Sequence, residues 1–229
     1  MKIYVDDIEV ELVRKSVKNI NLSILPPDGR VRVSAPHFVP EARIREFIQA
    51  KADWIREKRA DMSTRQREKC EYKEGDTLYV FGTPYRLSLS PASKRGSVTL
   101  YEGEIVIGAA NGEEAEYYYN EFLRKELFRE IGFLLPIWEE RTGLHPSSWS
   151  IKNMSTRWGS CNTETKKIWF SLGLGRKTSD CIEYVILHEL CHLRERGHGE
   201  RFRALMDEYM PAWRTIKHKL NMSDGGYDE

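Results

Sequence analysis

Long apolar runs are missing from this chain of 229 residues. No segment approaches the roughly 18 consecutive apolar residues of a membrane-spanning helix. The first residues, Met1–Val5, have the alternating pattern of a strand and lack the apolar core of a secretory signal. The sequence therefore predicts a cytoplasmic protein with no membrane association.

Cysteine is scarce as well, with four residues in the chain and no Cys-x-x-Cys pair of the kind common in structural zinc sites. Domains that depend on disulfides are usually small and have many closely spaced cysteines. We therefore expect free thiols in a reducing compartment, at Cys70, Cys161, Cys181 and Cys191.

A large excess of either charge is also absent. The chain has 36 Lys and Arg against 35 Asp and Glu, a net charge of +1, so no overall field attracts nucleic acid or acidic membranes. The distribution is uneven, because residues 150–180 carry six basic and two acidic side chains, whereas residues 71–149 carry eight and thirteen. The basic segment indicates either a solvated face or a surface for an anionic substrate.

The first half of the chain has mainly the pattern of β-structure, and a hydrophobic fraction of 40% is sufficient for a buried core. Apolar and polar residues alternate in short segments separated by turns, which predicts antiparallel strands. One helix is predicted at about 40–60, where an apolar stripe with helical spacing follows Pro40. No internal repeat is apparent. The predicted strands are 3–12, 20–25, 31–34, 77–80, 85–90, 97–101 and 104–107.

The second half changes to helical periodicity near residue 111. Apolar residues recur at helical spacing over 113–140, with a kink expected at Pro136 and a stop at Gly143. The sequence thus predicts an α+β fold, with a β-rich region over residues 1–110 and a helical core with a small antiparallel sheet over residues 111–229. Its other predicted elements are strands at 149–154 and 167–172, paired around the connection 155–162, and helices from Ser179 and over 200–221.

Three of the six histidines lie between residues 188 and 198, a spacing typical of a metal site. In a helix, His188 and His192 are separated by about 40° around the axis and about 6 Å along it, so both imidazoles project from one face. Glu189 lies beside this ligand face and can reach a water held by the metal. The pattern predicts a metal clamp with Glu189 as general base.

A catalytic zinc ion needs a third protein ligand and an open position for water. Gly197 is expected to end the helix in a left-handed conformation, so that His198 turns back and supplies the third nitrogen. Ordinary helix histidines are a weaker alternative, because burying these polar groups beside the apolar segment 184–187 is costly unless they are satisfied. A closed structural zinc is also weaker, because such sites usually contain paired cysteines, and the chain has no Cys-x-x-Cys pair. The alternative third ligands are the later carboxylates Glu200, Asp207 and Glu208.

Several further motifs accompany the histidines. They are Arg157-Trp158-Gly159-Ser160-Cys161, the metal motif 188–193 with His198, Met210-Pro211-Ala212-Trp213, and the segments 14–19 and 31–36. Together they resemble the YgjP-like family of predicted metal-dependent hydrolases, over nearly the whole chain. The resemblance implies a minimal zincin-like core related to the SprT and WLM peptidases, preceded by a mostly β N-terminal region.

The resemblance also implies where a group that stabilises the developing oxyanion lies. Arg157 is the first candidate, because it is in a turn of the segment that reaches the cleft in related zincins. A surface arginine with no catalytic role is the alternative reading of this residue. Other candidates for the oxyanion are His145, Tyr184 and Tyr209.

We expect a zinc-dependent hydrolase with Zn²⁺ as its cofactor, and a metallopeptidase with a peptide or protein substrate is the first choice. In one alternative, a module for nucleic acid or protein binding keeps the zinc and stacks bases on Trp158 and Trp169, although the intact Glu189 favours an enzyme. In the other, a nucleotide phosphohydrolase holds phosphates with Arg157, Lys166, Lys167, Arg176 or Lys177.

Overall fold

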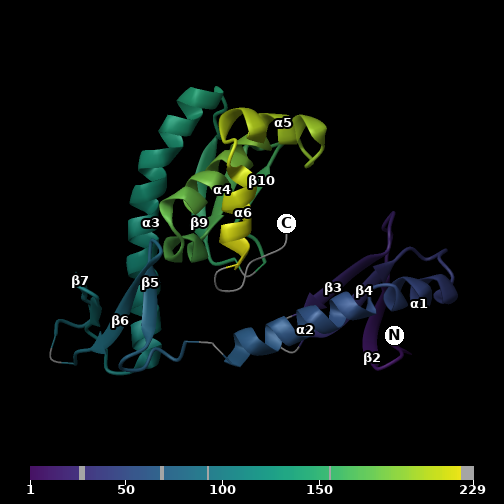
Figure 1. Cartoon of the computed structure of the whole chain (residues 1–229), viewed down its shortest axis with the longest axis horizontal. Helices are drawn as coiled ribbons and strands as arrows, with labels where there is room; N and C mark the ends of the chain where they lie inside the picture. Colours follow the sequence, from purple (N-terminus) through teal and green to yellow (C-terminus); the bar gives the residue numbers. More distant parts are fainter. Residues whose placement is uncertain (26–28, 68–69, 92, 155, 223–229) are drawn as a thin grey trace. The chain divides into compact units, whose positions relative to one another are not determined.

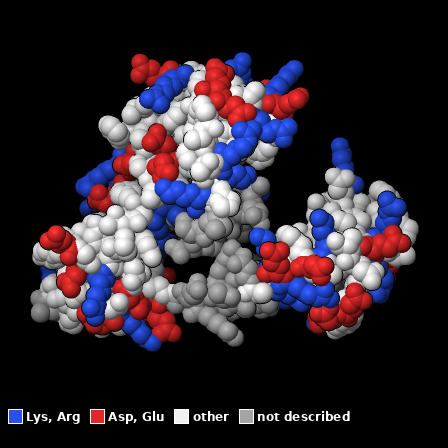
Figure 2. Space-filling view, viewed as in Figure 1, with Lys and Arg blue, Asp and Glu red and all other residues white. Residues whose placement is uncertain are grey.

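The computed structural model describes the chain apart from residues 26–28, 68–69, 92, 155 and 223–229. It contains two compact units, Met1–Lys69 and Cys70–Glu229, each with its own strands and helices (Figure 1). The described residues form six α-helices and three small sheets, which confirms the α+β class. Basic and acidic side chains both occur across each unit in the view of Figure 2.

The boundary between the units lies near residue 69 and not near residue 110, where the change of periodicity had placed it. Helix α3, Gly112–Thr142, explains the difference, because its first half packs on the sheet that precedes it. Tyr119 and Leu123 of this helix are buried in one cluster with Leu87 and Ile105 of the sheet. That sheet therefore belongs to the same unit as the histidine motif.

The first unit is a four-stranded sheet with two helices packed on it. The strand order is β1-β2-β4-β3, and β2 and β4 are parallel, so the prediction of purely antiparallel strands is wrong here. The predicted strand 3–12 is interrupted by a turn at Asp6, which has a positive φ of 52°. The elements are β1 (Lys2–Val5), β2 (Ile8–Arg14), β3 (Asn21–Leu25), β4 (Arg30–Ala35), α1 (Glu41–Gln49) and α2 (Ala52–Arg67).

A second four-stranded sheet begins the second unit. Its order, β5-β6-β8-β7, again places a parallel pair, β6 and β8, between two antiparallel pairs. Its strands are β5 (Thr77–Val80), β6 (Thr83–Leu89), β7 (Val98–Tyr101) and β8 (Glu104–Ile107).

These two sheets repeat one arrangement, a relationship that the sequence did not make apparent. The first hairpin of each turns at a residue with positive φ, Asp6 at 52° and Phe81 at 48°. The second hairpin turns at Gly29 and Gly103, with φ of 68° and 78°. The strand that follows buries alternate residues in both sheets: Val31, Val33 and Ala35 in the first, and Ile105 and Ile107 in the second.

Helix α3 begins at a side-chain cap and ends at a left-handed glycine. The side chain of Asn111 accepts a hydrogen bond of 2.9 Å from the N–H of Glu114. Gly143 has φ of 66°, which confirms the predicted stop, and the helix continues through Pro136. The second half of α3 packs against the helix that carries the histidine motif, so the two helices share one hydrophobic core beside the site.

The third sheet and the last helices complete the second unit. The strand order is β10-β11-β9, with β10 antiparallel and β9 parallel to β11, so the small sheet is mixed and not antiparallel as predicted. Residues 159–162, predicted as part of a connection, form the edge strand β10, opposite the other edge strand β9. The elements are β9 (Ser148–Lys152), β10 (Gly159–Asn162), β11 (Lys167–Ser171), the 3₁₀ helix η1 (Leu172–Arg176), α4 (Ser179–Cys191), α5 (Glu200–Tyr209) and α6 (Trp213–Met222).

The helix predicted over 200–221 is in fact two helices. Met210 adopts φ of −143° and ψ of 75°, outside the helical region, because the proline that follows it disfavours a helical conformation. The break turns α6 back so that it packs against α4. None of the helices in the described ranges combines the length and the apolar character needed to cross a membrane.

Candidate metal centre and substrate cleft

Helix α4 is buried along nearly its whole length, and the metal motif lies in its last turns. His188 and Glu189 are only 3% and 2% exposed. The helix ends at Cys191, with His192 as its C-terminal cap, and Gly197 lies beyond the helix without a positive φ. The predicted stop at Gly197 is therefore wrong. The chain leaves the helix in tight turns, in which the N–H groups of Leu193 and Glu195 donate to carbonyl groups of α4.

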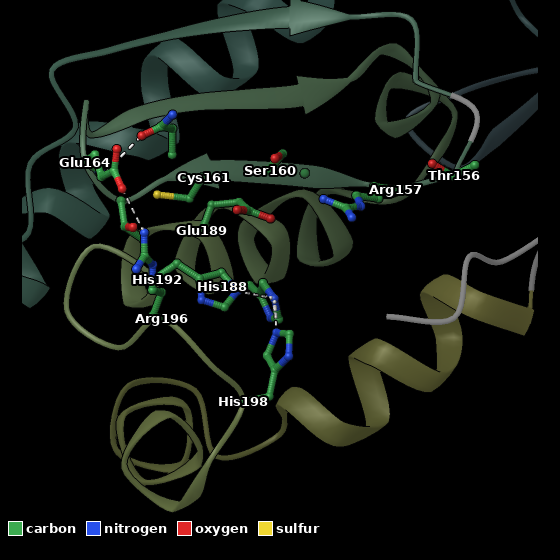
Figure 3. A pocket seen from close by; sticks show the side chains of 13 residues that line it. Thr156, Arg157, Ser160, Cys161, Glu164, His188, Glu189, His192, Arg196 and His198 are labelled. Atoms are coloured by element: carbon green, nitrogen blue, oxygen red, sulfur yellow. Dashed lines mark hydrogen bonds and ion pairs between the residues drawn. The ribbon is translucent and has the colours of Figure 1, made fainter. Parts of the chain in front are cut away.

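The three histidines of the motif nevertheless converge on one point (Figure 3). The Nε2 atom of His188 lies 3.2 Å from Nε2 of His192 and 3.0 Å from Nε2 of His198. Counting one nitrogen from each ring, all three nitrogens lie within 4.8 Å of one another. Separations of this size allow three nitrogens to share one metal ion at bonds of about 2 Å.

The other ring nitrogens of two of these histidines have hydrogen-bond partners. Nδ1 of His192 lies 3.0 Å from the carbonyl oxygen of Glu195, which can only accept a hydrogen bond. Nδ1 of His188 lies 3.4 Å from the hydroxyl of Tyr184, one turn earlier in α4. With the proton on Nδ1, the lone pair of each Nε2 faces the common point. This arrangement is typical of histidines that bind a metal.

Burial keeps these imidazoles in the form that a metal requires. Burial, reinforced by the neighbouring histidines, lowers the pKa of His188 to about 2. Burial also lowers the pKa of His192 and of His198. Neutral imidazoles bind divalent metals, and three of them are the donor set of several catalytic zinc sites. The residues present therefore fit Zn²⁺.

The side chain of Glu189 lies on the side of α4 that faces strand β10. Gly159 of that strand lies so close that a Cβ atom in its place would be 2.7 Å from Cγ and 2.8 Å from Cδ of Glu189, and closer still to Oε1. Real Cβ atoms do not approach other atoms so closely. Glycine at position 159 thus allows the carboxylate to lie between the strand and the histidines.

A cleft of about 640 Å³ runs along strand β10 past Glu189 and the three histidines (Figure 3). Arg157 lies at one end, just before the strand begins. Glu164 and Arg196 lie at the other end and form an ion pair of 3.1 Å. These two residues, and the strand itself, were missed by the sequence analysis. The small residues Gly159-Ser160-Cys161 followed by an Asn-Thr-Glu-Thr turn and the strand 167–171 are the hairpin signal that could have revealed them.

The cysteines near the site are thiols, not thiolates. Cys161 lines the cleft, and burial together with the nearby carboxylate of Glu189 raises its pKa to about 11. Burial raises the pKa of Cys191 to about 12. All four cysteines are free, as predicted. Neither Cys161 nor Cys191 is ionised near neutral pH, so neither has the character of a nucleophile.

Several other residues considered from the sequence lie elsewhere. Asp207 binds the indole N–H of Trp213 and the guanidinium of Arg214. Tyr184 is 1% exposed and contacts His188, so its hydroxyl is not placed for an oxyanion. Among the described residues, the lining of the cleft includes none of the remaining candidates for the third ligand or the oxyanion: Glu200, Glu208, His145 and Tyr209.

Apart from Arg157, the lining of the cleft includes none of the basic and aromatic residues named for the alternative functions. Trp158 is only 4% exposed and its ring faces the ammonium of Lys177, so it has no open face for a base. Arg176 donates a hydrogen bond to the side chain of Asn120. Of the side chains proposed to hold phosphates, the cleft lining includes Arg157 but not Lys166, Lys167, Arg176 or Lys177.

Comparison with known proteins now identifies the family. Residues 18–223 match the family model described as YgjP-like, metallopeptidase domain. The chain belongs to the YgjP-like family. Membership of this family, together with the histidine cluster, supports a metal-dependent hydrolase as the general class.

A solved structure and a search of curated proteins complete the comparison. The crystal structure of the metallopeptidase zymogen of Pyrococcus abyssi abylysin is similar to part of the chain, with a TM-score of 0.40 and 14% sequence identity. The similarity covers 43% of this chain and 99% of the other. No curated protein matches this sequence.

Proposed function

We propose that this YgjP-like protein is a zinc-dependent metallopeptidase that cleaves an extended peptide bound along strand β10. The observation that carries the proposal is the position of β10, which is one of the two edge strands of its sheet within the described chain and lines the cleft beside the histidine cluster. An extended peptide binds well at such an edge, because backbone hydrogen bonds add it to the sheet as a further strand.

The hydrogen-bond pattern of β10 favours this mode of binding. Ser171 donates its N–H to the carbonyl oxygen of Trp158 at 2.8 Å. Because hydrogen-bonded pairs alternate along an antiparallel ladder, Ser160 and Asn162 are the residues of β10 that bond to β11. The N–H and C=O groups of Gly159 and Cys161 then point to the open edge. A peptide in the cleft can bond to both.

The protein groups around the bound peptide have separate roles in this proposal. His188, His192 and His198 hold zinc, which supplies a Lewis acid and lowers the pKa of water toward neutrality when bound. Glu189 accepts the proton of the attacking water and returns it to the leaving amine. Its buried position between β10 and the histidines supports this role.

Arg157 is the proposed cationic residue of the machinery. It lines the cleft at the start of β10 and is exposed there, and in the close view its guanidinium is directed along the cleft toward Glu189 (Figure 3). A guanidinium in this position stabilises negative charge on the bound substrate.

The proposal is tested with the zinc-loaded wild type and the variant Glu189→Gln on peptides and on nucleoside triphosphates. Peptide cleavage is expected for the wild type, with a loss of about 10²- to 10⁴-fold in the variant. The matched control is Glu208→Gln on the exposed side of α5, which should keep both zinc and turnover. Hydrolysis of triphosphates without peptide cleavage would instead assign the site to a phosphohydrolase.

A further inference from the structure

The two ends of the cleft differ in charge. At one end, Glu164 and Arg196 are ion-paired and largely neutralise each other. At the other end, Arg157 is exposed, and no carboxylate of the described residues forms an ion pair with it. A substrate that fills the cleft therefore meets, at the Arg157 end only, a guanidinium that forms no ion pair with the described residues.

The direction of β10 determines which part of a substrate reaches that end. The strand runs from Gly159 to Asn162, so Arg157 precedes it and Glu164 follows it. Added strands pair in the antiparallel sense more often than in the parallel sense, and slightly more stably. A peptide antiparallel to β10 has its N-terminal side near Glu164 and its C-terminal side near Arg157.

The position of Glu189 along β10 determines how far Arg157 lies from the cleaved bond. The general base lies against Gly159, and Arg157 is two residues earlier in the chain. Strands rise about 3.3 Å per residue, and the guanidinium is directed back along the cleft toward Glu189 (Figure 3). It therefore reaches substrate groups within about three residues beyond the cleaved bond. A carboxylate is the substrate group that a guanidinium binds best, through two parallel hydrogen bonds.

From this arrangement we infer that Arg157 is a specificity-determining residue that binds a carboxylate on the C-terminal side of the cleaved bond. The carboxylate is an Asp or Glu side chain or the terminal carboxylate of the peptide. This inference rests on the proposed peptidase function and specifies the negative charge that Arg157 stabilises. It differs from the oxyanion role predicted from the sequence, since the carboxylate is already charged in the bound substrate.

The two roles have different kinetic consequences. Loss of a group that binds a substrate carboxylate raises KM for acidic peptides and leaves peptides without that carboxylate unaffected. Loss of a group that stabilises the transition state lowers kcat for every peptide. A comparison across peptides therefore separates a specificity role from an oxyanion role.

The test is a peptide library cut by the zinc-loaded protein, with cleavage sites mapped by mass spectrometry. The library is used twice, once with free C-termini and once with amidated C-termini, on the wild type, Arg157→Gln and Arg196→Gln. The wild type should favour an acidic residue or a free C-terminus within about three residues after the cut, by about tenfold in kcat/KM. Arg157→Gln should lose this preference through KM, whereas Arg196→Gln, at the other end, should retain it.

Three results would overturn the inference. They are an acidic preference on the N-terminal side of the cut, the absence of any preference for acid in the wild type, and a uniform fall of kcat in Arg157→Gln. If the protein is not a peptidase at all, the result is different. The zinc-loaded wild type would then cut no peptide, and the zinc-loaded Glu189→Gln variant would bind no peptide in a fluorescence titration. In that event the inference falls with the proposed function.

Discussion

Gly159 and Glu189 are in direct contact, although thirty residues of sequence separate them. A methyl group on Gly159 would lie 2.7 Å from Cγ and 2.8 Å from Cδ of the glutamate. The strand that is proposed to bind the substrate and the helix that carries the proposed base are thus packed as closely as backbone and side chain allow. The position of the carboxylate depends on the absence of a side chain at residue 159.

Gly159→Ala should therefore disturb catalysis with zinc still bound. The added methyl group must displace either β10 or Glu189, so we expect an activity loss of up to about a hundredfold, the usual effect of a misplacement of about 1 Å. Overpacking of this kind costs about 1–3 kcal/mol of stability. The measurements are zinc content, peptide turnover and the free energy of unfolding.

The matched control is Gly132→Ala in helix α3. Apart from the adjacent residues and the neighbouring backbone of α3 itself, no atom of the described residues lies within 4 Å of the position of its added Cβ. This variant should therefore keep activity and gain about 0.5–1 kcal/mol of stability. Full activity and unchanged stability in Gly159→Ala would show that the contact with Glu189 is not needed for function.

Tyr184→Phe should weaken zinc binding. The variant removes the hydroxyl that lies 3.4 Å from Nδ1 of His188 and keeps the ring that packs beside Trp213. Loss of such a partner of a metal-binding histidine commonly weakens metal affinity by about 10- to 100-fold. Competition with a chromophoric chelator measures this, and Tyr209→Phe, a half-buried tyrosine of the same core, is the control. Equal affinities for both variants would exclude the positioning role of the hydroxyl.

His198→Ala should remove zinc from the protein at metal concentrations that saturate the wild type. Its Nε2 atom is the third nitrogen of the cluster, and two imidazoles alone form a weaker site. Asp207→Ala and Glu208→Ala should retain zinc, because Asp207 already binds Trp213 and Arg214. Retention of zinc in His198→Ala together with its loss in either carboxylate variant would identify a different third ligand.

The metal-free protein should lose stability as the pH falls below about 6.5, the ordinary pKa of histidine. Burial lowers the pKa of His188 to about 2 in the folded chain, so between these values the unfolded chain binds the additional proton. Stability therefore rises with pH across this window, by about 1 kcal/mol per pH unit for this group. Denaturant unfolding from pH 7 to pH 5 measures the slope. A His188→Asn variant with the same slope as the wild type would contradict this assignment.

The clustering of the histidines could be predicted from the sequence because it depends largely on local spacing. His188 and His192 lie one turn apart in a helix, and this relationship needs no knowledge of the rest of the fold. The way the chain reaches His198 could not be predicted in the same manner. The helix ends at Cys191, since turns made by backbone hydrogen bonds replace the expected glycine stop.

The repeated sheet and the edge strand were missed for a different reason. The two sheets share only alternating buried positions and the turn residues, such as Gly29 and Gly103, and these are too few for recognition in a sequence. Strand β10 has four small or polar residues, Gly159–Asn162, and its place beside β11 is set by tertiary packing against α4. The boundary at residue 69 similarly follows from the packing of α3.

Peptide turnover before and after removal of zinc tests the central claim most directly. The zinc-loaded wild type should cleave an extended peptide, lose this activity on chelation and regain it when one equivalent of zinc is restored, whereas Glu189→Gln with the same zinc content should remain inactive in all three states. Cleavage that survives chelation, or a Glu189→Gln variant as active as the wild type, would contradict a peptidase that depends on this histidine cluster and this glutamate.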